Sequence, residues 1–347
     1  MGLKVDEAIK NINKNMKCDF VTKGLPQYEY KRIPFTSPRL NYMTFGGIPI
    51  GKICEFYGEE HGGKTTTSLD IVANFQNLDL EDVPKGILYG DIENRLDPVW
   101  ATKLGVKLDD ENFYLLKPES QGAETIFEQM LVLMETGEIG LVIVDSLGSM
   151  MSDQEYEKSI EDKTYGGISM ALTKFGKKAE LLCNKYNLTI IGINQLRADM
   201  NSTYGGMRTT GGEYWKFICS VRMEFRMGKY FDEKGNELTR QAENPVGNYV
   251  LVTMKKNSTC PPTRRTGYYS INYLIGIDYL RDLIEVAIKY GIIDKSGAWF
   301  SIVDTETGEV LEKFQGQAKL NDFLGQEENV EYLKKIEDYI DSQIYLE

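Results

Sequence analysis

One stretch of eight residues has the composition and spacing of a phosphate-binding loop. Residues 58–65 read Gly-Glu-Glu-His-Gly-Gly-Lys-Thr and fill every fixed position of the pattern G-x-x-x-x-G-K-[ST]. Successive backbone N–H groups of such a loop surround a phosphate, and the positive end of the following helix adds to the attraction. Lys64 is expected to reach the β- and γ-phosphates, and the Thr65 hydroxyl to ligate Mg²⁺. The motif therefore predicts a nucleoside triphosphate site.

The residues that flank this loop support the same interpretation. Residues 53–57 form an apolar run typical of a buried strand, and residues 66–77 have helical spacing. His61 is the only histidine in the chain. We expect it to be a solvent-facing residue in the variable part of the loop. The residues predicted to surround the phosphates are Gly58, Glu59, Glu60, His61, Gly62, Gly63, Lys64, Thr65 and Thr66.

Two acidic residues lie at the ends of apolar segments, which is where parallel sheets place the residues that bind ligands. Asp145 ends the apolar run 141–145, and open α/β sheets bind ligands at the carboxyl ends of their strands. A carboxylate there can help hold Mg²⁺, or it can cap the turn that follows. Glu93 follows the strand expected over residues 86–91. It could activate water as a general base, and a plain surface carboxylate is the alternative.

The chain alternates apolar segments with segments of helical spacing, which predicts an α/β fold with a mostly parallel sheet. Residues 221–227 instead alternate apolar and charged side chains, which predicts antiparallel strands at one edge of the sheet. An amphipathic stripe over residues 4–16 predicts an N-terminal helix, and a helix from Ile277 opens a small C-terminal module. The expected strands cover 53–57, 86–91, 113–117, 141–145, 188–194, 248–255 and 268–273, and the other expected helices cover 66–77, 122–136 and 168–186.

Composition excludes several classes of protein. With 347 residues, 41% of them hydrophobic, the chain can build one large domain and a small one. It contains no apolar run long enough to span a membrane, and its N-terminus lacks the apolar core of a signal peptide. The five cysteines are scattered without a C-x-x-C pair, which favours reduced thiols over a zinc site. We therefore expect a cytoplasmic protein with no membrane partner.

The net charge of −12 is unevenly distributed along the chain. Residues 301–347 include 12 acidic and 4 basic residues, which is compatible with a solvated helical face. Between residues 195 and 229 the balance reverses, and a locally basic segment can meet phosphates even in an acidic protein. The charged residues of that segment are Arg197, Arg208, Lys216, Arg222, Arg226 and Lys229, against Asp199, Glu213 and Glu224.

Longer motifs resemble those of the RecA family, which includes bacterial and phage-encoded members. Residues 91–106 read DIENRLDPVWATKLGV, residues 193–197 read INQLR, and residues 209–212 read TTGG. The same order continues in Lys216-Phe217, Ser220-Val221-Arg222 and Gly297-Ala298-Trp299-Phe300. The resemblance is collinear from about Gly47 to Phe300. It implies a RecA-like P-loop ATPase core that binds ATP and Mg²⁺.

The resemblance implies roles for individual residues of the nucleotide site. Glu93 would activate the attacking water, Asp145 would be the Walker B carboxylate, and Gln195 would sense the γ-phosphate. Trp100 matches the family's adenine-stacking aromatic residue, and Asp97 matches a carboxylate near the adenine amino group. From the residues alone, Trp100 would be a core aromatic residue. The expected catalytic residues are thus Glu93, Lys64 and Gln195, and the expected metal ligands are Thr65 and Asp145.

Two segments, residues 157–166 and 195–212, resemble the family's DNA-contacting loops. A glycine-rich loop with arginines and an aromatic residue suits single-stranded DNA, because cations contact phosphates and a flat side chain can stack on bases. The residues alone leave a disordered surface loop as the alternative. The first loop is crowded with charge, and the second is one residue shorter than the bacterial form. The residues expected to contact DNA are Tyr165, Arg197, Tyr204, Gly205, Arg208, Gly211 and Gly212.

The family also supplies lysines across the subunit interface to the neighbour's ATP. Lys255 and Lys256 fall in the matching region, but their Lys-Lys-Asn spacing departs from the bacterial Lys-x-Lys pattern. Lys255 is the better aligned of the two. By the same resemblance, residues 1–36 form a polymerisation arm with a helix and a strand, residues 37–273 the ATPase core with its DNA-binding loops, and residues 274–347 a small α+β C-terminal domain with the acidic end.

The resemblance implies an ATP-dependent DNA strand-exchange recombinase. Such a protein is a DNA-dependent ATPase that forms helical filaments of itself on single-stranded DNA and pairs it with homologous duplex DNA. A single-stranded-DNA-binding protein and a loading mediator are further expected partners, in the cytoplasm of a bacterial or phage-infected cell. Two alternatives are a ring helicase motor on the same ATPase core and an ATP-gated single-stranded-DNA-binding mediator. The presence of both Glu93 and Asp145 argues against the mediator.

Overall fold

The computed structural model describes residues 2–17, 21, 30–157, 167–199, 206–233, 236–239 and 241–344. The chain divides into two compact units, Met1–Lys31 and Arg32–Glu347. The first unit contains helix α1 (Gly2–Met16), where the apolar stripe predicts one. Val5, Ile12 and Met16 of this stripe are exposed.

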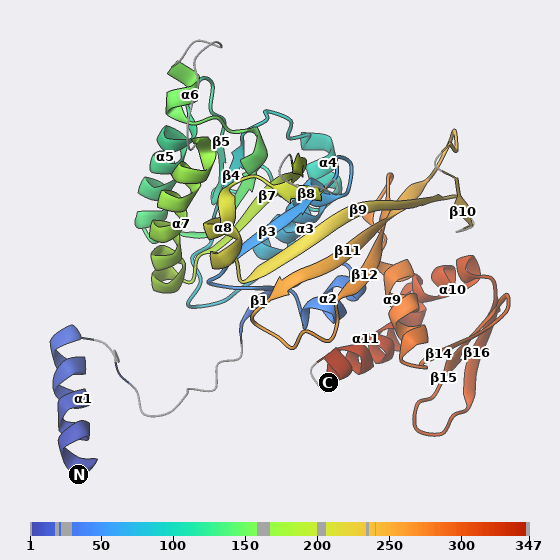
Figure 1. Cartoon of the computed structure of the whole chain (residues 1–347). Coiled ribbons are helices and arrows are strands. Elements are labelled where there is room, and N and C mark those ends of the chain that lie inside the picture. The colour runs from blue at the N-terminus through green and yellow to red at the C-terminus, as the bar shows by residue number, and fades with distance from the viewer. Residues whose placement is uncertain are drawn as a thin grey trace. The chain divides into compact units, whose positions relative to one another are not determined.

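A large sheet forms the centre of the second unit (Figure 1). Its parallel part has the strand order β9-β3-β7-β6-β4-β5, in agreement with the predicted mostly parallel sheet. Strands β3, β4 and β6 are almost entirely buried, as expected of central strands covered on both faces. Their bounds are β3 (Ile53–Gly58), β4 (Gly86–Asp91), β5 (Phe113–Leu116), β6 (Ile139–Asp145), β7 (Thr189–Asp199) and β9 (Val221–Phe231).

Antiparallel strands extend this sheet beyond β9, as the period-two pattern predicts. Strand β9 itself is antiparallel to β11 but parallel to β3, and the sequence pattern did not reveal this second pairing. The reason is the path of the chain, which returns along β8 and through helix α8 before it enters β9 in the direction of β3. The elements are β8 (Gly206–Thr209), α8 (Gly212–Ile218), β10 (Glu237–Leu238), β11 (Gly247–Asn257), β12 (Thr266–Asn272) and β13 (Gly276–Ile277).

Helices cover both faces of the sheet and create two apolar cores. Helix α3 (Lys64–Gln76) packs on one face, together with α2 (Pro38–Thr44). Helices α5 (Ala123–Glu135) and α7 (Gly167–Tyr186) pack side by side on the other face. Shorter elements are β1 (Arg32–Ile33), β2 (Ile48–Pro49), α4 (Pro98–Lys103), the 3-10 turn η1 (Leu147–Ser149) and α6 (Asp153–Glu157). Among the described residues, no helix is both long and apolar enough to cross a membrane.

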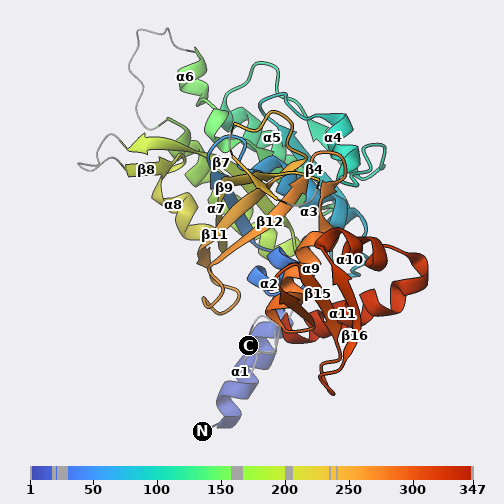
Figure 2. The same cartoon turned by 90° about the vertical axis from the view of Figure 1, so that its right-hand side faces the viewer.

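The C-terminal module has its own apolar core and its own antiparallel sheet (Figure 2). This arrangement agrees with the small α+β module expected from the sequence. Its elements are α9 (Tyr279–Lys289), β14 (Ile293–Ser296), β15 (Trp299–Val303), β16 (Val310–Gln315), α10 (Gln317–Leu324), η2 (Glu327–Asn329) and α11 (Val330–Ile344).

A buried carboxylate joins α9 to the start of α2 and to β12. Asp282 is fully buried, and its Oδ2 accepts a hydrogen bond from Ser37 Oγ at 2.5 Å. Its Oδ1 accepts another from the backbone N–H of Ser270 at 3.1 Å. Burial raises the pKa of Asp282 from 3.8 to about 8, because the apolar surroundings disfavour the ionised form. The folded protein therefore binds a proton here that the unfolded chain releases near pH 4.

This difference predicts how stability depends on pH. Because the pKa of Asp282 is higher in the folded state, its contribution is fully present below pH 4 and is lost as the pH rises towards 8. The unmodified protein should therefore lose this contribution between pH 5 and pH 8, whereas Asp282→Asn stays uncharged and should not. The melting temperature of the variant minus that of the unmodified protein should increase over this range. Thermal unfolding at both values tests this. The same comparison with Asp79→Asn, whose side chain is 91% exposed, is the control, and parallel pH profiles for Asp282→Asn would contradict the prediction.

Candidate functional site

The phosphate-binding loop connects β3 to α3 through a backbone path that requires glycine. A Cβ atom on Gly58 would lie 1.9 Å from the carbonyl oxygen of Phe225, so no other residue fits between the loop and β9. Gly63 has a φ of +91°, and it turns the chain into the first residue of α3. His61 also has a positive φ of +57°. The loop therefore presents its backbone at the N-terminus of a 13-residue helix, where anions bind.

Lys64 extends back over this loop. Its Nζ donates hydrogen bonds to the carbonyl oxygens of Gly58 at 3.2 Å and Glu59 at 2.6 Å. Only 8% of the residue is exposed, and this burial lowers the pKa of Lys64, while Asp145 and Glu60 act in the opposite direction. The backbone carbonyl groups of the loop therefore hold the ammonium group of Lys64 close to the loop.

Thr65 and Asp145 meet at the carboxyl ends of the strands. Thr65 Oγ1 donates a hydrogen bond to Asp145 Oδ2 at 2.8 Å, and the Tyr89 hydroxyl donates to the same oxygen at 3.1 Å. Burial raises the pKa of Asp145 to about 6, although both hydrogen bonds lower it. A hydroxyl and a carboxylate side by side are the hard oxygen ligands that Mg²⁺ prefers. Within the described ranges, no three His, Cys, Asp or Glu side chains form a metal cluster, so phosphates and water would supply the other ligands.

Glu93 lies beside this pair, held by four side chains. Its Oε1 accepts hydrogen bonds from Ser146 Oγ at 2.6 Å, from Ser149 Oγ and from Gln195 Nε2 at 3.0 Å. Its Oε2 forms an ion pair with Arg95 at 3.1 Å. Burial acts to raise the pKa of Glu93, but the two serine hydrogen bonds and nearby positive charges outweigh it, and the pKa is lowered. Glu93 is therefore ionised at neutral pH and can accept a proton.

Seven predicted residues of the nucleotide site come together in one cavity of about 240 Å³. Ser146 also lines it, and sequence reasoning missed both Ser146 and Ser149 as partners of Glu93. The signal was their position just after the end of β6, where ligands bind, since Ser146 follows Asp145 directly and Ser149 lies in the next turn. The seven residues are Glu60, His61, Lys64, Thr65, Glu93, Asp145 and Gln195.

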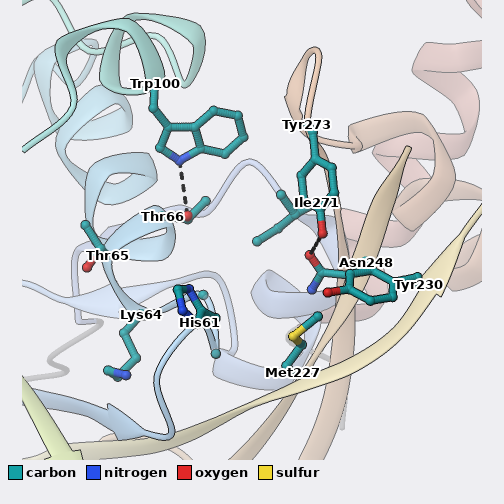
Figure 3. Close-up of a pocket in the computed structure, with 12 residues that line it drawn as sticks. His61, Lys64, Thr65, Thr66, Trp100, Met227, Tyr230, Asn248, Ile271 and Tyr273 are labelled. Carbon is teal, nitrogen blue, oxygen red and sulfur yellow. Dashed lines mark hydrogen bonds between the residues drawn. The ribbon is translucent and has the colours of Figure 1, made fainter. Parts of the chain in front are cut away.

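A second cavity of about 580 Å³ opens on the other side of the loop (Figure 3). Trp100 of α4 forms one wall, and its Nε1 donates a hydrogen bond to Thr66 Oγ1 at 3.2 Å. Trp100 is also partly buried and packs against one of the two apolar cores, so its role in stacking on adenine stays a prediction. Asp97 caps α4 by accepting hydrogen bonds from the backbone N–H groups of Val99 and Trp100. Asp97 does not line this cavity.

Tyr273, which sequence reasoning missed, forms the opposite wall of this cavity (Figure 3). It follows β12 directly, and the period-two pattern of that strand was its only signal. Its carbonyl oxygen accepts a hydrogen bond from Lys103 Nζ at 3.5 Å, which connects it to the end of α4. A flat side chain on each wall suits an aromatic base, because aromatic rings attract each other when stacked.

The segment expected to be the second DNA-contacting loop is partly a two-stranded ribbon. Strands β7 and β8 (labelled in Figure 2) pair antiparallel. In this pairing Arg197 lies directly opposite Arg208. Arg197 also donates a hydrogen bond to the Gly148 carbonyl at 2.8 Å. The segment is therefore not a loop at either end, since β7 continues to Asp199 and Gly211 caps α8, which begins at Gly212. Its contact with DNA stays a prediction.

Some residues expected to contact DNA lie outside the described residues. They are Tyr165, with residues 158–166 of the first loop, and Tyr204 and Gly205 of the second.

The two lysines expected to act across a subunit interface lie near the end of β11. Lys255 Nζ forms an ion pair with Glu224 at 2.8 Å. Lys256 Nζ donates hydrogen bonds to the carbonyl oxygens of Lys216 at 3.2 Å and Phe217 at 2.5 Å. Neither lysine lines either of the two cavities described above.

Comparison with known proteins gives matches over nearly the whole chain. The model of the RecA N-terminal domain matches residues 4–278, and that of the RecA C-terminal domain matches residues 281–345. The Protein RecA of Fusobacterium nucleatum is 34% identical over 91% of this chain and 80% of its own length. That of Thermus thermophilus is 33% identical over 89% and 87%, and that of Ureaplasma parvum is 32% identical over 88% and 86%. The chain therefore belongs to the RecA family.

Proposed function

We propose that this chain is an ATP-dependent DNA strand-exchange recombinase. It is a DNA-dependent ATPase that assembles on single-stranded DNA, pairs it with homologous duplex DNA and hydrolyses ATP. One observation carries the proposal beyond family membership. Gln195 donates a hydrogen bond to Glu93 in the cavity beside the phosphate-binding loop, and two residues later the same strand carries Arg197 in the ribbon formed by β7 and β8.

The geometry supports a role for each residue of the ATP site. Lys64 binds the β- and γ-phosphates, and Thr65 and Asp145 hold Mg²⁺, which neutralises phosphate charge when it is bound. Glu93 takes the proton of the attacking water, because it is ionised and faces the same cavity. Gln195 exchanges its hydrogen bond to Glu93 for one to the γ-phosphate, and the residues that follow it on β7 respond to this change.

Arg197 and Arg208 are proposed to contact the DNA backbone. Arg197 and Arg208 lie directly opposite each other in the ribbon, so two guanidinium groups, each able to bind a phosphate, share one short segment. Single-stranded DNA offers such phosphates at every nucleotide. The ribbon is therefore an anion site whose position depends on β7 and, through Gln195, on the state of the nucleotide.

Replacing both Arg197 and Arg208 with Ala should weaken binding to single-stranded DNA and reduce its salt dependence. Each lost phosphate contact should lower the slope of log affinity against log salt by roughly 0.7, so the double variant should lose about 1.4. Fluorescence anisotropy at several salt concentrations measures the slope. Lys229→Ala is the matched control, because Lys229 pairs with Glu237 away from the ribbon. An unchanged slope in the double variant would exclude these DNA contacts.

Residues 1–36 are proposed to act as a polymerisation arm that docks on a second copy of this chain. The exposed apolar stripe of α1 supports this proposal, because a stable amphipathic helix buries its apolar face against a partner. Lys255 and Lys256 are proposed to complete the neighbour's ATP site, with Lys255 the stronger candidate. The ATP site of each chain would then be complete only when a neighbouring chain is present in the filament.

Deletion of residues 1–20 should leave a folded monomer that binds ATP and cannot polymerise. Sedimentation with ATP and single-stranded DNA measures assembly, and the melting temperature reports folding. A truncated protein that still assembles would rule out the interface role. Loss of folding on truncation would instead indicate that α1 packs on its own chain.

Electron microscopy tests the proposed function as a whole. With single-stranded DNA and a non-hydrolysable ATP analogue, the protein should form helical filaments. With ATP and homologous duplex DNA, it should exchange strands. Closed rings that translocate would indicate a helicase motor, and coated DNA without hydrolysis or pairing would indicate a mediator.

The same proposal includes further partners and a cellular location. A single-stranded-DNA-binding protein would compete for the same DNA, and a loading mediator would relieve that competition. The bacterial relatives support a cytoplasmic location in a bacterial or phage-infected cell. The boundaries 37–273 for the ATPase core and 274–347 for the C-terminal domain complete the proposed organisation.

A further inference from the structure

The wall of the large cavity opposite Trp100 is built by neighbouring strands. Asn248 of β11 lies opposite Tyr230 of β9 and opposite Ile271 of β12, and all three side chains line the cavity (Figure 3). The pairing of β11 with β9 is irregular between Asn248 and Val250. Such β-bulges re-aim side chains and are frequent next to functional sites.

Asn248 is fixed in this wall by two hydrogen bonds. Its Oδ1 accepts a hydrogen bond from the Tyr273 hydroxyl at 2.8 Å, and its Nδ2 donates one to the Tyr249 carbonyl at 2.9 Å. Only 6% of Asn248 is exposed. Because the acceptor and donor ends of the amide are both engaged, its orientation is set by the protein itself.

The position of Tyr273 is less restrained by the strands than that of Asn248. It follows the last residue of β12, and 37% of its surface is exposed. A ring in such a position loses side-chain entropy when it is ordered against a ligand. The hydrogen bond to Asn248 orders the ring before the ligand arrives, and preorganisation of this kind increases affinity.

We propose that Asn248 is a positioning residue for the aromatic base of the bound nucleoside triphosphate. It holds the Tyr273 ring in the wall opposite Trp100, so that the base enters a slot already formed. The phosphates are bound by the separate loop at residues 58–65, and Asn248 should therefore affect the base and not the phosphates. The inference rests on the proposed function in one respect, which is that a nucleoside triphosphate occupies this cavity.

The test compares ATP with inorganic tripolyphosphate, which has no base, in calorimetric titrations of the full chain with Mg²⁺. Asn248→Ala and Tyr273→Phe should each weaken ATP binding roughly threefold to tenfold, as expected for one hydrogen bond. The double variant should bind ATP no more weakly than the weaker single variant, because both changes remove the same bond. Binding of tripolyphosphate should be unchanged in all three.

A matched control is Tyr268→Phe, which removes a hydroxyl from the same strand. That hydroxyl donates a hydrogen bond to Glu285 at 2.6 Å and lies outside the cavity, so ATP binding should not change. The proposal is overturned if the two single effects add, if neither changes ATP affinity, or if ATP and tripolyphosphate weaken equally. Tyr273→Phe keeps its ring, so it remains an informative variant if Asn248→Ala fails to fold.

Lys64→Ala separates this inference from the proposed function. It should weaken ATP and tripolyphosphate together, because Lys64 belongs to the phosphate-binding loop. If Lys64→Ala binds ATP normally, the assignment of the nucleotide site itself fails. If it loses ATP while Asn248→Ala binds normally, only the role of Asn248 fails.

Discussion

Glu93→Gln should keep ATP binding and lose roughly 10²- to 10⁴-fold in the rate of hydrolysis, the range that a general base contributes. The carboxylate of Glu93 has a lowered pKa and faces the cavity that contains Lys64, Thr65 and Asp145. Glutamine has the same shape, and its carbonyl oxygen can still accept the hydrogen bonds from Ser146 and Ser149. It cannot take a proton from water. Phosphate release with single-stranded DNA and nucleotide titration measure the two effects separately.

Glu128→Gln is the matched control for this variant. Glu128 is an exposed glutamate of α5 that lines neither of the two cavities described above. Its hydrolysis rate should remain close to that of the unmodified protein. If Glu93→Gln hydrolyses ATP at the unmodified rate, the general-base assignment is wrong. If it loses ATP binding as well, Glu93 contributes to the binding of nucleotide before any chemistry occurs.

The parts of the site that sequence predicted are those encoded locally. The phosphate-binding loop is one contiguous stretch, and Asp145 and Glu93 each follow an apolar strand whose end determines their place. Parallel pairing of β4 with β6 then brings Asp91 and Asp145 level with each other. The strand pattern therefore contained the information needed to bring both carboxylates to one edge of the sheet.

The parts that sequence did not predict depend on contacts between distant segments. Tyr273 and Asn248 are 25 residues apart and meet only because β11 and β12 are neighbours. Trp100 joins them from α4, which lies on another part of the chain. The hydrophobic pattern of the sequence does not predict such contacts, because it shows which face of a strand is exposed and not which strand lies next to it.

The pairing of β9 was missed for a related reason. An alternating sequence indicates that one face of a strand is buried, but it does not fix the direction of the next strand. Here β9 is parallel to β3 and antiparallel to β11. Its sequence therefore alternates apolar and charged residues, as in an antiparallel strand, although β9 is also the last strand of the parallel part of the sheet. In the same way, glycines expected in a DNA-contacting loop begin α8.

Lys64→Ala should abolish ATP binding at physiological concentrations and, with it, assembly on DNA. Lys64 is the only lysine or arginine in residues 58–65. Hydrogen bonds to charged groups contribute about 1.5–3 kcal/mol each, and contacts to two phosphates would amount to roughly 10²- to 10⁴-fold in affinity. The substitution also removes the donor from the carbonyl oxygens of Gly58 and Glu59, which would leave the loop less ordered.

Two measurements separate loss of binding from loss of folding in Lys64→Ala. Nucleotide titration gives the affinity, and the melting temperature reports the fold, which should persist because the cores on both faces of the sheet are untouched. Lys64→Arg keeps the charge but replaces a compact ammonium with a planar group that the 8% exposed site has little room to hold. It should therefore also bind weakly, which would show that position as well as charge is required. A folded Lys64→Ala protein that binds ATP normally would exclude residues 58–65 as the phosphate site.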